Sequence, residues 1–168
     1  RDGVRVTCEV APHHFTLTDE ACASFDPAFK VHPPLRSASD VAAVRAGLAD
    51  GTIDAIATDH APHTPEAKER PFEEAPPGML GLETAAALAY TELVESGECS
   101  LAQVLAALSW NPARIAGVED RHGVAIAPGA PANLCVFDPT ATWTVDPAGL
   151  ASRARNTPFA GRTLHGRV

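Results

Sequence analysis

Two short apolar runs in the first third of the chain have the pattern of β-strands. Residues 4–10 alternate β-branched with other residues and stop at Ala11-Pro12, which predicts a strand followed by a loop. Residues 53–57 form a short, mostly apolar run of the kind found in a parallel sheet that is covered on both faces. The chain is therefore expected to contribute two parallel strands to such a sheet.

Helical patterns follow both predicted strands. Ser37-Ala38-Ser39-Asp40 supplies an N-cap signature ahead of apolar residues at helical spacing, and Asp50-Gly51 ends this helix. After the second strand, a polar, proline-rich loop over residues 64–81 leads to a predicted helix at residues 82–96, and loops of this length are usually functional. Two further helix starts are predicted, at the capping box Ser100-Leu101-Ala102-Gln103 and at Asn111-Pro112 with Asn as the cap.

The order of these elements predicts an α/β fold. Because two parallel strands cannot close a sheet alone, the first part of the chain is expected to be a slice of such a fold. Glycine and proline then dominate until Asn133-Leu134-Cys135-Val136-Phe137-Asp138, which predicts a strand of a different, mostly β unit. The boundary is placed near Arg121, so that residues 1–121 and 122–168 form two units.

Composition excludes several functional classes. The 168 residues are 45% hydrophobic and 20% charged, as in soluble globular proteins. Thirteen Lys and Arg face 21 Asp and Glu without a basic cluster, so neither nucleic acid nor an anionic membrane is an expected partner. No apolar run approaches the roughly 20 residues of a membrane span. The four cysteines form no C-x-x-C pair and no export signal is visible, which favours a cytoplasmic protein with reduced thiols.

Candidate chemistry is concentrated where the second predicted strand ends. Asp59 follows that strand directly, at the end where α/β barrels carry their catalytic residues. His60 and His63 follow it, which suggests a metal site or a proton-transfer site. The alternative is that Asp59 caps the loop through backbone N–H groups and that both histidines are ordinary loop residues. Spacing alone leaves both interpretations open.

Two other segments carry weaker signals. Glu9 lies near the end of the first predicted strand, where it could support a metal ligand or pair with an arginine. His13-His14 follows a proline, and the pair could bind a metal or form structural hydrogen bonds. Prolines hold His32-Pro33-Pro34-Leu35-Arg36 extended, as a rigid connector or a substrate contact.

Three of these segments recur together in one enzyme family. They are Cys8-Glu9-Val10-Ala11-Pro12-His13-His14, His32-Pro33-Pro34-Leu35-Arg36 and Ala57-Thr58-Asp59-His60-Ala61-Pro62-His63. In order and spacing they resemble the dihydroorotases of the bacterial, longer-chain type. The resemblance continues through Glu74-Ala75-Pro76-Pro77-Gly78, Gly81-Leu82-Glu83-Thr84, Asn111-Pro112-Ala113 and Asn156-Thr157-Pro158-Phe159-Ala160-Gly161, and so covers essentially the whole chain.

The resemblance implies a metal-dependent amidohydrolase built on a (β/α)8 barrel. Such an enzyme interconverts carbamoyl-aspartate and dihydroorotate in pyrimidine synthesis, with one or two zinc ions as cofactor. Residues 1–121 would hold the last strands and helices of the barrel, and residues 122–168 part of a small β domain. The family's other metal ligands would lie before Arg1. The chain is therefore expected to be an incomplete fragment that is inactive alone.

The resemblance also implies roles for particular residues. Asp59 would bind a zinc, take a proton from the metal-bound hydroxide and deliver it to the departing ring nitrogen. His63 would hydrogen-bond the substrate carboxylate, and Pro77 and Gly78 would belong to the loop that covers the pyrimidine ring. His32 stands where these enzymes commonly have Asn, and its ring could still donate one hydrogen bond to substrate. Residues expected to support the site without holding the metal are Glu9, His13 and His60.

Two alternatives are kept. One is a related cyclic amidohydrolase, such as a hydantoinase or an allantoinase, although those relatives typically depart from the full run that ends at His63. The other is a non-catalytic dihydroorotase homologue that serves as a scaffold for aspartate transcarbamoylase, although such homologues lose metal ligands and Asp59 is present here. The expected partners are a small-molecule substrate and either a second copy of the protein or aspartate transcarbamoylase.

Overall fold

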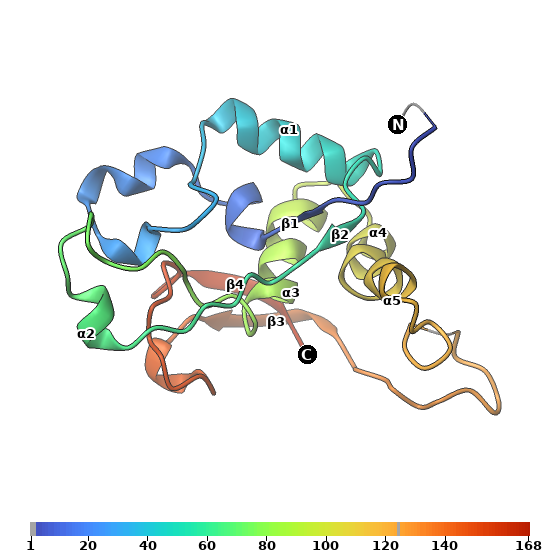
Figure 1. The fold of residues 1–168 in the computed structure, drawn as a ribbon. Helices are drawn as coiled ribbons and strands as arrows, with labels where there is room; N and C mark the ends of the chain where they lie inside the picture. The colour runs from blue at the N-terminus through green and yellow to red at the C-terminus, as the bar shows by residue number, and fades with distance from the viewer. Residues whose placement is uncertain (1–2, 124) are drawn as a thin grey trace.

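The computed structural model describes residues 3–123 and 125–168, and its first half is built on one parallel strand pair. Strands β1 (Glu9–Val10) and β2 (Ala55–Ile56) pair in parallel, and helix α1 (Ala38–Ala49) lies between them in the chain. Figure 1 shows α1 along one side of the pair. The predicted α/β order of strand, helix and strand is confirmed.

Both strands are shorter than the sequence pattern predicts. The run over residues 4–10 narrows to Glu9–Val10, and the run over residues 53–57 narrows to Ala55–Ile56. A few backbone hydrogen bonds extend the pairing, since the Ala55 amide donates to the Cys8 carbonyl at 3.3 Å. A strand requires a hydrogen-bonded neighbour along its length. In the described part of the chain β1 has only β2 beside it, and residues 3–9 are exposed.

The predicted helix starts at Ser37 and Ser100 are confirmed as capping boxes. The Ser37 hydroxyl accepts from the Asp40 amide, and the Asp40 carboxylate accepts from the Ser37 amide in return. Ser100 and Gln103 repeat this arrangement at the start of α4 (Leu101–Leu105). Each box pairs backbone N–H groups that the first helical turn leaves unbonded.

Two other helical predictions are corrected. The helix expected at residues 82–96 begins at Ala85, as α3 (Ala85–Ala89), and continues as the π-helical turn η4 (Tyr90–Val94). Asn111 is not a cap, because α5 (Asn111–Ala116) continues directly from the preceding helical turn and Trp110 takes the cap position. The Asn111 side chain instead donates to the Asp54 carbonyl at 2.8 Å.

Short helices complete the chain. Helix α2 (Pro65–Lys68) lies inside the long loop before α3. The remaining turns are the π-helical η5 (Ala106–Trp110) and the 3-10 helices η1 (Pro12–Phe15), η2 (Asp19–Ser24), η3 (Pro27–Phe29) and η6 (Pro147–Gly149). No helix within residues 3–123 and 125–168 combines the length and apolar character that a membrane crossing needs.

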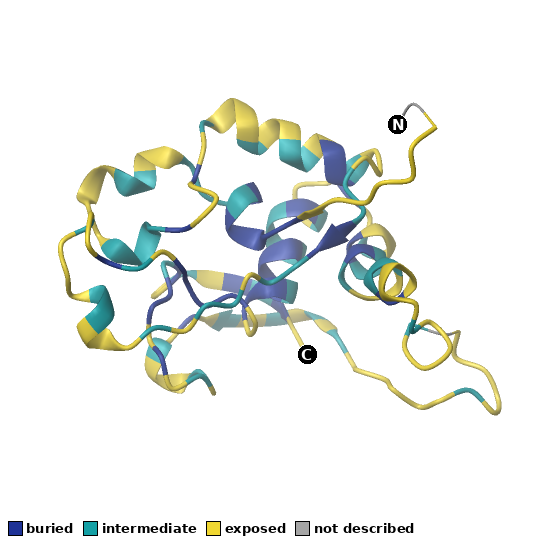
Figure 2. Ribbon diagram, viewed as in Figure 1, coloured by how far each residue is buried: buried dark blue, intermediate teal, exposed yellow. Residues whose placement is uncertain are grey.

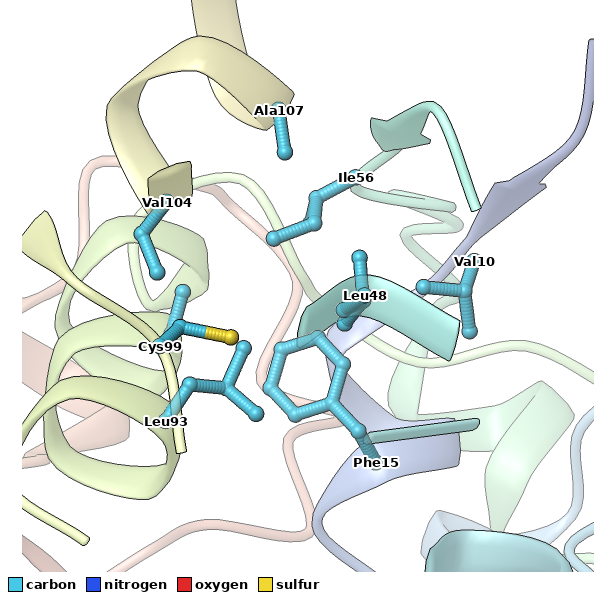
Figure 3. Packing of buried hydrophobic residues seen from close by; sticks show 9 residues of the cluster. Val10, Phe15, Leu48, Ile56, Leu93, Cys99, Val104 and Ala107 are labelled. Carbon is cyan, nitrogen blue, oxygen red and sulfur yellow. The ribbon is translucent and has the colours of Figure 1, made fainter. Parts of the chain in front are cut away.

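An apolar core packs against the β1–β2 strand pair. Phe15 of η1 and Leu93 of η4 are fully buried, and Leu48 of α1 packs with them. Figure 3 shows these side chains pointing toward one another, with Val10 and Ile56 entering from the two strands. Truncating a buried Phe or Leu to Ala typically costs about 2 to 5 kcal/mol. This core therefore holds the carboxyl ends of β1 and β2, and the loops that follow them, in a fixed relation.

The C-terminal part forms an antiparallel pair that packs on α3. Strands β3 (Asp138–Thr144) and β4 (Thr163–Arg167) pair with Trp143 opposite Leu164. Leu88 of α3 is buried in one apolar cluster with Val145, Phe159 and Leu164. Figure 1 shows both strands beside α3. The predicted division near Arg121 remains a prediction.

The strand expected at residues 133–138 is wrong in position. Residues 131–137 form an irregular, mostly exposed segment, drawn in yellow in Figure 2, and β3 begins only at Asp138. Leu134 and Val136 are 62% and 85% exposed. The physical reason is strand pairing. β3 pairs with β4, and this pairing begins at Asp138, opposite Arg167.

Candidate functional site

Asp59 stands on a sharp turn just beyond the carboxyl end of β2. Its backbone has φ of +46°, in the left-handed region that most residues avoid and that Asp and Asn tolerate best. The Asp59 side chain is 44% exposed, so the carboxylate is open on one side. A non-glycine residue in this conformation is often found at functional sites, where the surrounding structure enforces it.

His13 of η1 lies on the buried side of Asp59. The His13 Nε2 atom is 3.5 Å from the Asp59 Oδ2 atom, and the His13 side chain is only 2% exposed. Burial, assisted by the neighbouring His14, lowers the pKa of His13 to about 3. The His13 ring is therefore neutral at neutral pH, and the contact is not an ion pair. Within the described residues, His13 Nε2 makes no hydrogen bond.

A second contact leads from His13 to the segment that carries His32. The rings of His13 and His14 lie with centroids 4.2 Å apart. His14 Nε2 is 2.9 Å from the Pro33 carbonyl oxygen, so this nitrogen carries the proton, because a carbonyl only accepts. The bond holds Pro33, and the exposed His32 directly precedes it.

His60 has a structural use. Its Nδ1 atom accepts hydrogen bonds from the amides of Gly81 and Leu82, both at 3.2 Å, so Nδ1 is unprotonated. These bonds tie the end of β2 to the segment that leads into α3. A Cβ atom on Gly81 would overlap the Thr58 carbonyl oxygen, so the close approach requires glycine.

The predicted substrate-contact residues His63, Pro77 and Gly78 lie together. His63 Nε2 is 3.0 Å from the Pro77 carbonyl oxygen, so Nε2 carries a proton and donates it to this carbonyl. The other ring nitrogen, Nδ1, is not used in this bond. Gly78 has φ of +134°, and a Cβ atom there would lie 2.7 Å from both His63 Nε2 and Ala61 Cβ. The two loops therefore touch with no room for a side chain between them.

Asn156 is the residue to which sequence reasoning gave no role. It is 7% exposed. Its Oδ1 atom accepts from the His63 amide at 3.1 Å, and its Nδ2 atom donates to the carbonyls of Ala61 at 2.9 Å and Gly78 at 3.2 Å. A signal was present, since Asn156-Thr157-Pro158 belongs to the segments that resemble dihydroorotases.

Glu9 is not brought into this group. Its side chain is exposed on β1. Across residues 3–123 and 125–168, no hydrogen bond or ion pair joins Glu9 to Asp59, His13 or His60. Of the three residues predicted to support the site, His13 contacts Asp59, and His60 accepts hydrogen bonds from the segment that leads into α3. Glu9 contacts none of these residues through a hydrogen bond or ion pair in the described part of the chain.

The residues present would supply one part of a metal site. The open Asp59 carboxylate beside the unpartnered His13 Nε2 offers an oxygen ligand of the kind that zinc accepts. Among the described residues, no three His, Cys, Asp or Glu side chains converge to hold a metal ion. A catalytic zinc requires at least three protein ligands, so the others would have to come from outside this set.

The curated relatives of this chain include bacterial dihydroorotases. The dihydroorotase of Pelotomaculum thermopropionicum is 57% identical over 164 residues, which are 98% of this chain and 38% of that protein. The dihydroorotase of Streptomyces coelicolor is 50% identical over 166 residues, 99% of this chain and 39% of that protein. The chain thus spans less than two fifths of the length of these relatives. The predicted resemblance to dihydroorotases is confirmed.

Solved structures with the same fold are more distant in sequence. An L-hydantoinase (dihydropyrimidinase) from Arthrobacter aurescens superposes with a TM-score of 0.92 at 30% identity, covering 99% of this chain and 37% of that one. A dihydropyrimidinase from Brevibacillus agri gives a TM-score of 0.87 at 27% identity, covering 99% and 38%. The prediction that the chain is one portion of a larger α/β fold is confirmed. Since residues 6–168 also match the Amidohydrolase family, this chain belongs to the amidohydrolase family.

Proposed function

We propose that the complete protein containing this chain is a zinc-dependent dihydroorotase. It would reversibly hydrolyse the cyclic amide of dihydroorotate to N-carbamoyl-aspartate, in pyrimidine biosynthesis in the cytoplasm. The observation that carries the proposal is that the chain beyond the end of β2 holds both the open Asp59 carboxylate and, four residues on, His63, which contacts the Pro77 carbonyl. We call the contact surface formed by His63, Pro77 and Gly78 the substrate wall. The 57% identity to a dihydroorotase, against 30% to a hydantoinase, supports the choice of substrate.

Hydrolysis of a cyclic amide needs a group that moves one proton. A water oxygen bonds to the amide carbon, the carbon–nitrogen bond breaks, and the ring nitrogen leaves only if it receives a proton. The Asp59 carboxylate fits this role, because it is exposed on one side and held by the turn on the other. It accepts the proton that the water loses and delivers it to the ring nitrogen.

Asp59 would also be one ligand of the zinc. When bound, zinc polarises the amide carbonyl and increases the acidity of water. His13 lies on the buried side of Asp59, with Nε2 3.5 Å from the carboxylate, and would help to hold the carboxylate in place.

His63 and the Pro77–Gly78 segment bind the substrate. While His63 Nε2 donates to the Pro77 carbonyl, a second proton on Nδ1 would let the ring also donate to the substrate carboxylate. The Pro77–Gly78 segment would cover the substrate ring and exclude water. His32 is exposed beside Pro33, which His14 holds near His13, and it could donate a further hydrogen bond to substrate.

The identity of the substrate is tested with a chimaeric enzyme. This chain replaces the matching 164-residue segment of the P. thermopropionicum dihydroorotase, to which it is 57% identical. The purified chimaera is assayed with dihydroorotate, hydantoin and allantoin, and its zinc content is measured. Turnover of dihydroorotate supports the proposal, and turnover only of the other two assigns a hydantoinase or allantoinase. A folded, inactive chimaera that binds aspartate transcarbamoylase would favour the scaffold.

A further inference from the structure

One amide side chain joins the two loops that form the substrate wall. Asn156 bonds through Oδ1 to the His63 amide, and through Nδ2 to the carbonyls of Ala61 and Gly78. A fourth bond runs from the Leu80 amide to the Asn156 main-chain carbonyl at 3.0 Å. Asn156 is thus bonded to both sides of the contact between His63 and the Pro77–Gly78 segment.

We propose that Asn156 is a positioning residue for the substrate site. It holds the loop that carries His63 at a fixed distance from the loop that carries Gly78, so that the carboxylate contact and the ring cover keep one geometry. This inference rests on the proposed function for the identity of the substrate. The positioning itself is a property of the chain and can be measured without turnover.

The chemistry of these contacts requires a carboxamide. One acceptor must face the His63 amide while two donors face the Ala61 and Gly78 carbonyls, and only an amide offers both on one planar group. The opposite orientation of the amide would set like groups against one another. Aspartate would keep the acceptor and place a negative oxygen against two carbonyls. Because Asn156 is 7% exposed, water cannot readily replace the lost donors.

The two loops pack closely at Gly78. A Cβ atom on Gly78 would lie only 2.7 Å from His63 Nε2, so a shift of either loop changes the distance between Gly78 and the His63 ring. The His63 ring itself reaches the Pro77 carbonyl. A change at Asn156 is therefore transmitted to the His63 ring and not only to its backbone.

Asn156 is anchored in the C-terminal part of the chain. Thr157 beside it is buried, and Phe159 packs in the cluster shared by α3 and the β3–β4 pair. The Phe159 amide donates to the Thr157 hydroxyl at 3.2 Å, which fixes this turn. The C-terminal strand pair thus supports the substrate wall through Asn156.

The test uses Asn156→Asp and Asn156→Ser in the chimaera, with Asn133→Asp as matched control. Asn133 is exposed, and its Nδ2 donates to the Arg121 carbonyl and lies 3.5 Å from His122 Nδ1, far from the substrate wall in the sequence. Two readouts are taken: amide hydrogen exchange of peptides covering residues 60–64 and 77–81, and KM and kcat for dihydroorotate. The Asn156→Ser change is also made in a His63→Ala background.

We expect faster exchange in both peptides for both Asn156 variants, with α1 unchanged. KM should rise about tenfold, as for the loss of a buried hydrogen bond or two, while kcat falls less. In the His63→Ala background, the further rise caused by Asn156→Ser should be smaller, because Asn156 acts partly through His63. Asn133→Asp should change none of these.

Other outcomes overturn the inference in distinguishable ways. Unchanged exchange and an unchanged KM would show that Asn156 does not position the wall. A lower melting temperature with the same KM, or failure of both variants to fold, would assign Asn156 to fold stability alone. If the chimaera lacks activity but the exchange result holds, the proposed function fails and the positioning role stands.

Discussion

The Nε2 atom of His13 faces the Asp59 carboxylate at 3.5 Å, and His13 Nε2 has no hydrogen-bond partner among the described residues. A buried nitrogen without a partner costs free energy of folding, typically about 1 to 3 kcal/mol. Such a cost persists at functional sites, where groups are arranged for the reaction and not for stability. From this relationship we predict that His13 supports the proposed proton transfer by Asp59.

Replacing His13 by Phe should separate activity from stability. The ring volume is largely kept and the unpaired nitrogen is removed, so the melting temperature of the chimaera should stay the same or rise. Turnover should fall about 10- to 100-fold, as is typical when a residue that supports a metal ligand is lost. Thermal unfolding and steady-state kinetics measure the two effects. The exposed His122, changed to Gln, serves as control. A loss of stability with full activity would contradict the assigned role.

The Asp59→Asn variant should nearly abolish turnover and leave the fold intact. An amide can neither accept the proton nor supply the negative charge that a metal ligand needs. Asn also tolerates the left-handed conformation that Asp59 adopts at φ of +46°. The melting temperature should therefore stay near that of the parent chimaera, whereas Asp59→Ala should lose about 1 kcal/mol more from the strained turn. Substantial turnover by Asp59→Asn would remove Asp59 from the proton transfer.

Gly78→Ala should weaken substrate binding through a steric effect. Gly78 and Gly97 both have positive φ, at +134° and +79°, so alanine is strained at either position. Only at Gly78 would the new methyl group meet neighbours, His63 Nε2 and Ala61 Cβ at 2.7 Å, whereas nothing lies within 4 Å at Gly97.

The matched pair therefore isolates the contact. Gly97→Ala should cost about 1 kcal/mol of stability. Gly78→Ala should cost about 1 to 3 kcal/mol more, the range for overpacking, and should raise KM for dihydroorotate. Equal effects of the two variants on stability and KM would show that the loops can move apart freely.

Local features of the fold were predictable from the sequence, and distant pairings were not. The capping boxes at Ser37 and Ser100 depend on residues three positions apart, so a short window contains all their chemistry. The strand at residues 4–10 was predicted too long, because its length depends on a partner some 45 residues away. The same cause misplaced the strand at residues 133–138.

The candidate site divides in the same way. Asp59 and His63 were predicted because they share one short run at the end of a strand. Asn156 was missed as a site residue because its contacts with Ala61 and His63 span 95 and 93 residues, and no periodicity reports such a bond. Gly78 was placed by resemblance alone, and its physical reason, the closeness of His63, appears only in three dimensions.

Lys68 should make stability depend on pH in the alkaline range. Its Nζ donates to the carbonyls of Pro27 at 2.7 Å and Pro76 at 3.0 Å, anchoring the loop before Gly78. Burial, with a smaller effect of Lys30 and opposed by Asp26, lowers the pKa of Lys68 from 10.5 to about 8. Between these values the unfolded chain binds more protons at Lys68 than the folded one, so stability rises with pH.

The measurement compares Lys68→Met with the parent chimaera. The difference in melting temperature, parent minus variant, should be smallest below pH 8 and increase toward pH 10.5. Arg153→Met is the control, since Arg153 is exposed and a guanidinium keeps its charge throughout this range. A difference that stays constant with pH would show that Lys68 titrates alike in the folded and unfolded states.

The 168-residue chain assayed by itself should not hydrolyse dihydroorotate, even with added zinc. Asp59 is one carboxylate, and the described residues contain no group of three side chains that could hold the metal, while a catalytic zinc needs three protein ligands. Isothermal titration with zinc should accordingly detect no stoichiometric binding that Asp59→Asn removes. Mixing the chain with the remaining segment of the P. thermopropionicum dihydroorotase should restore turnover if the two parts associate, and Asp59→Asn in the chain should prevent it. Turnover by the isolated chain, or submicromolar zinc binding through Asp59, would mean that this chain holds ligands that the structure does not bring together.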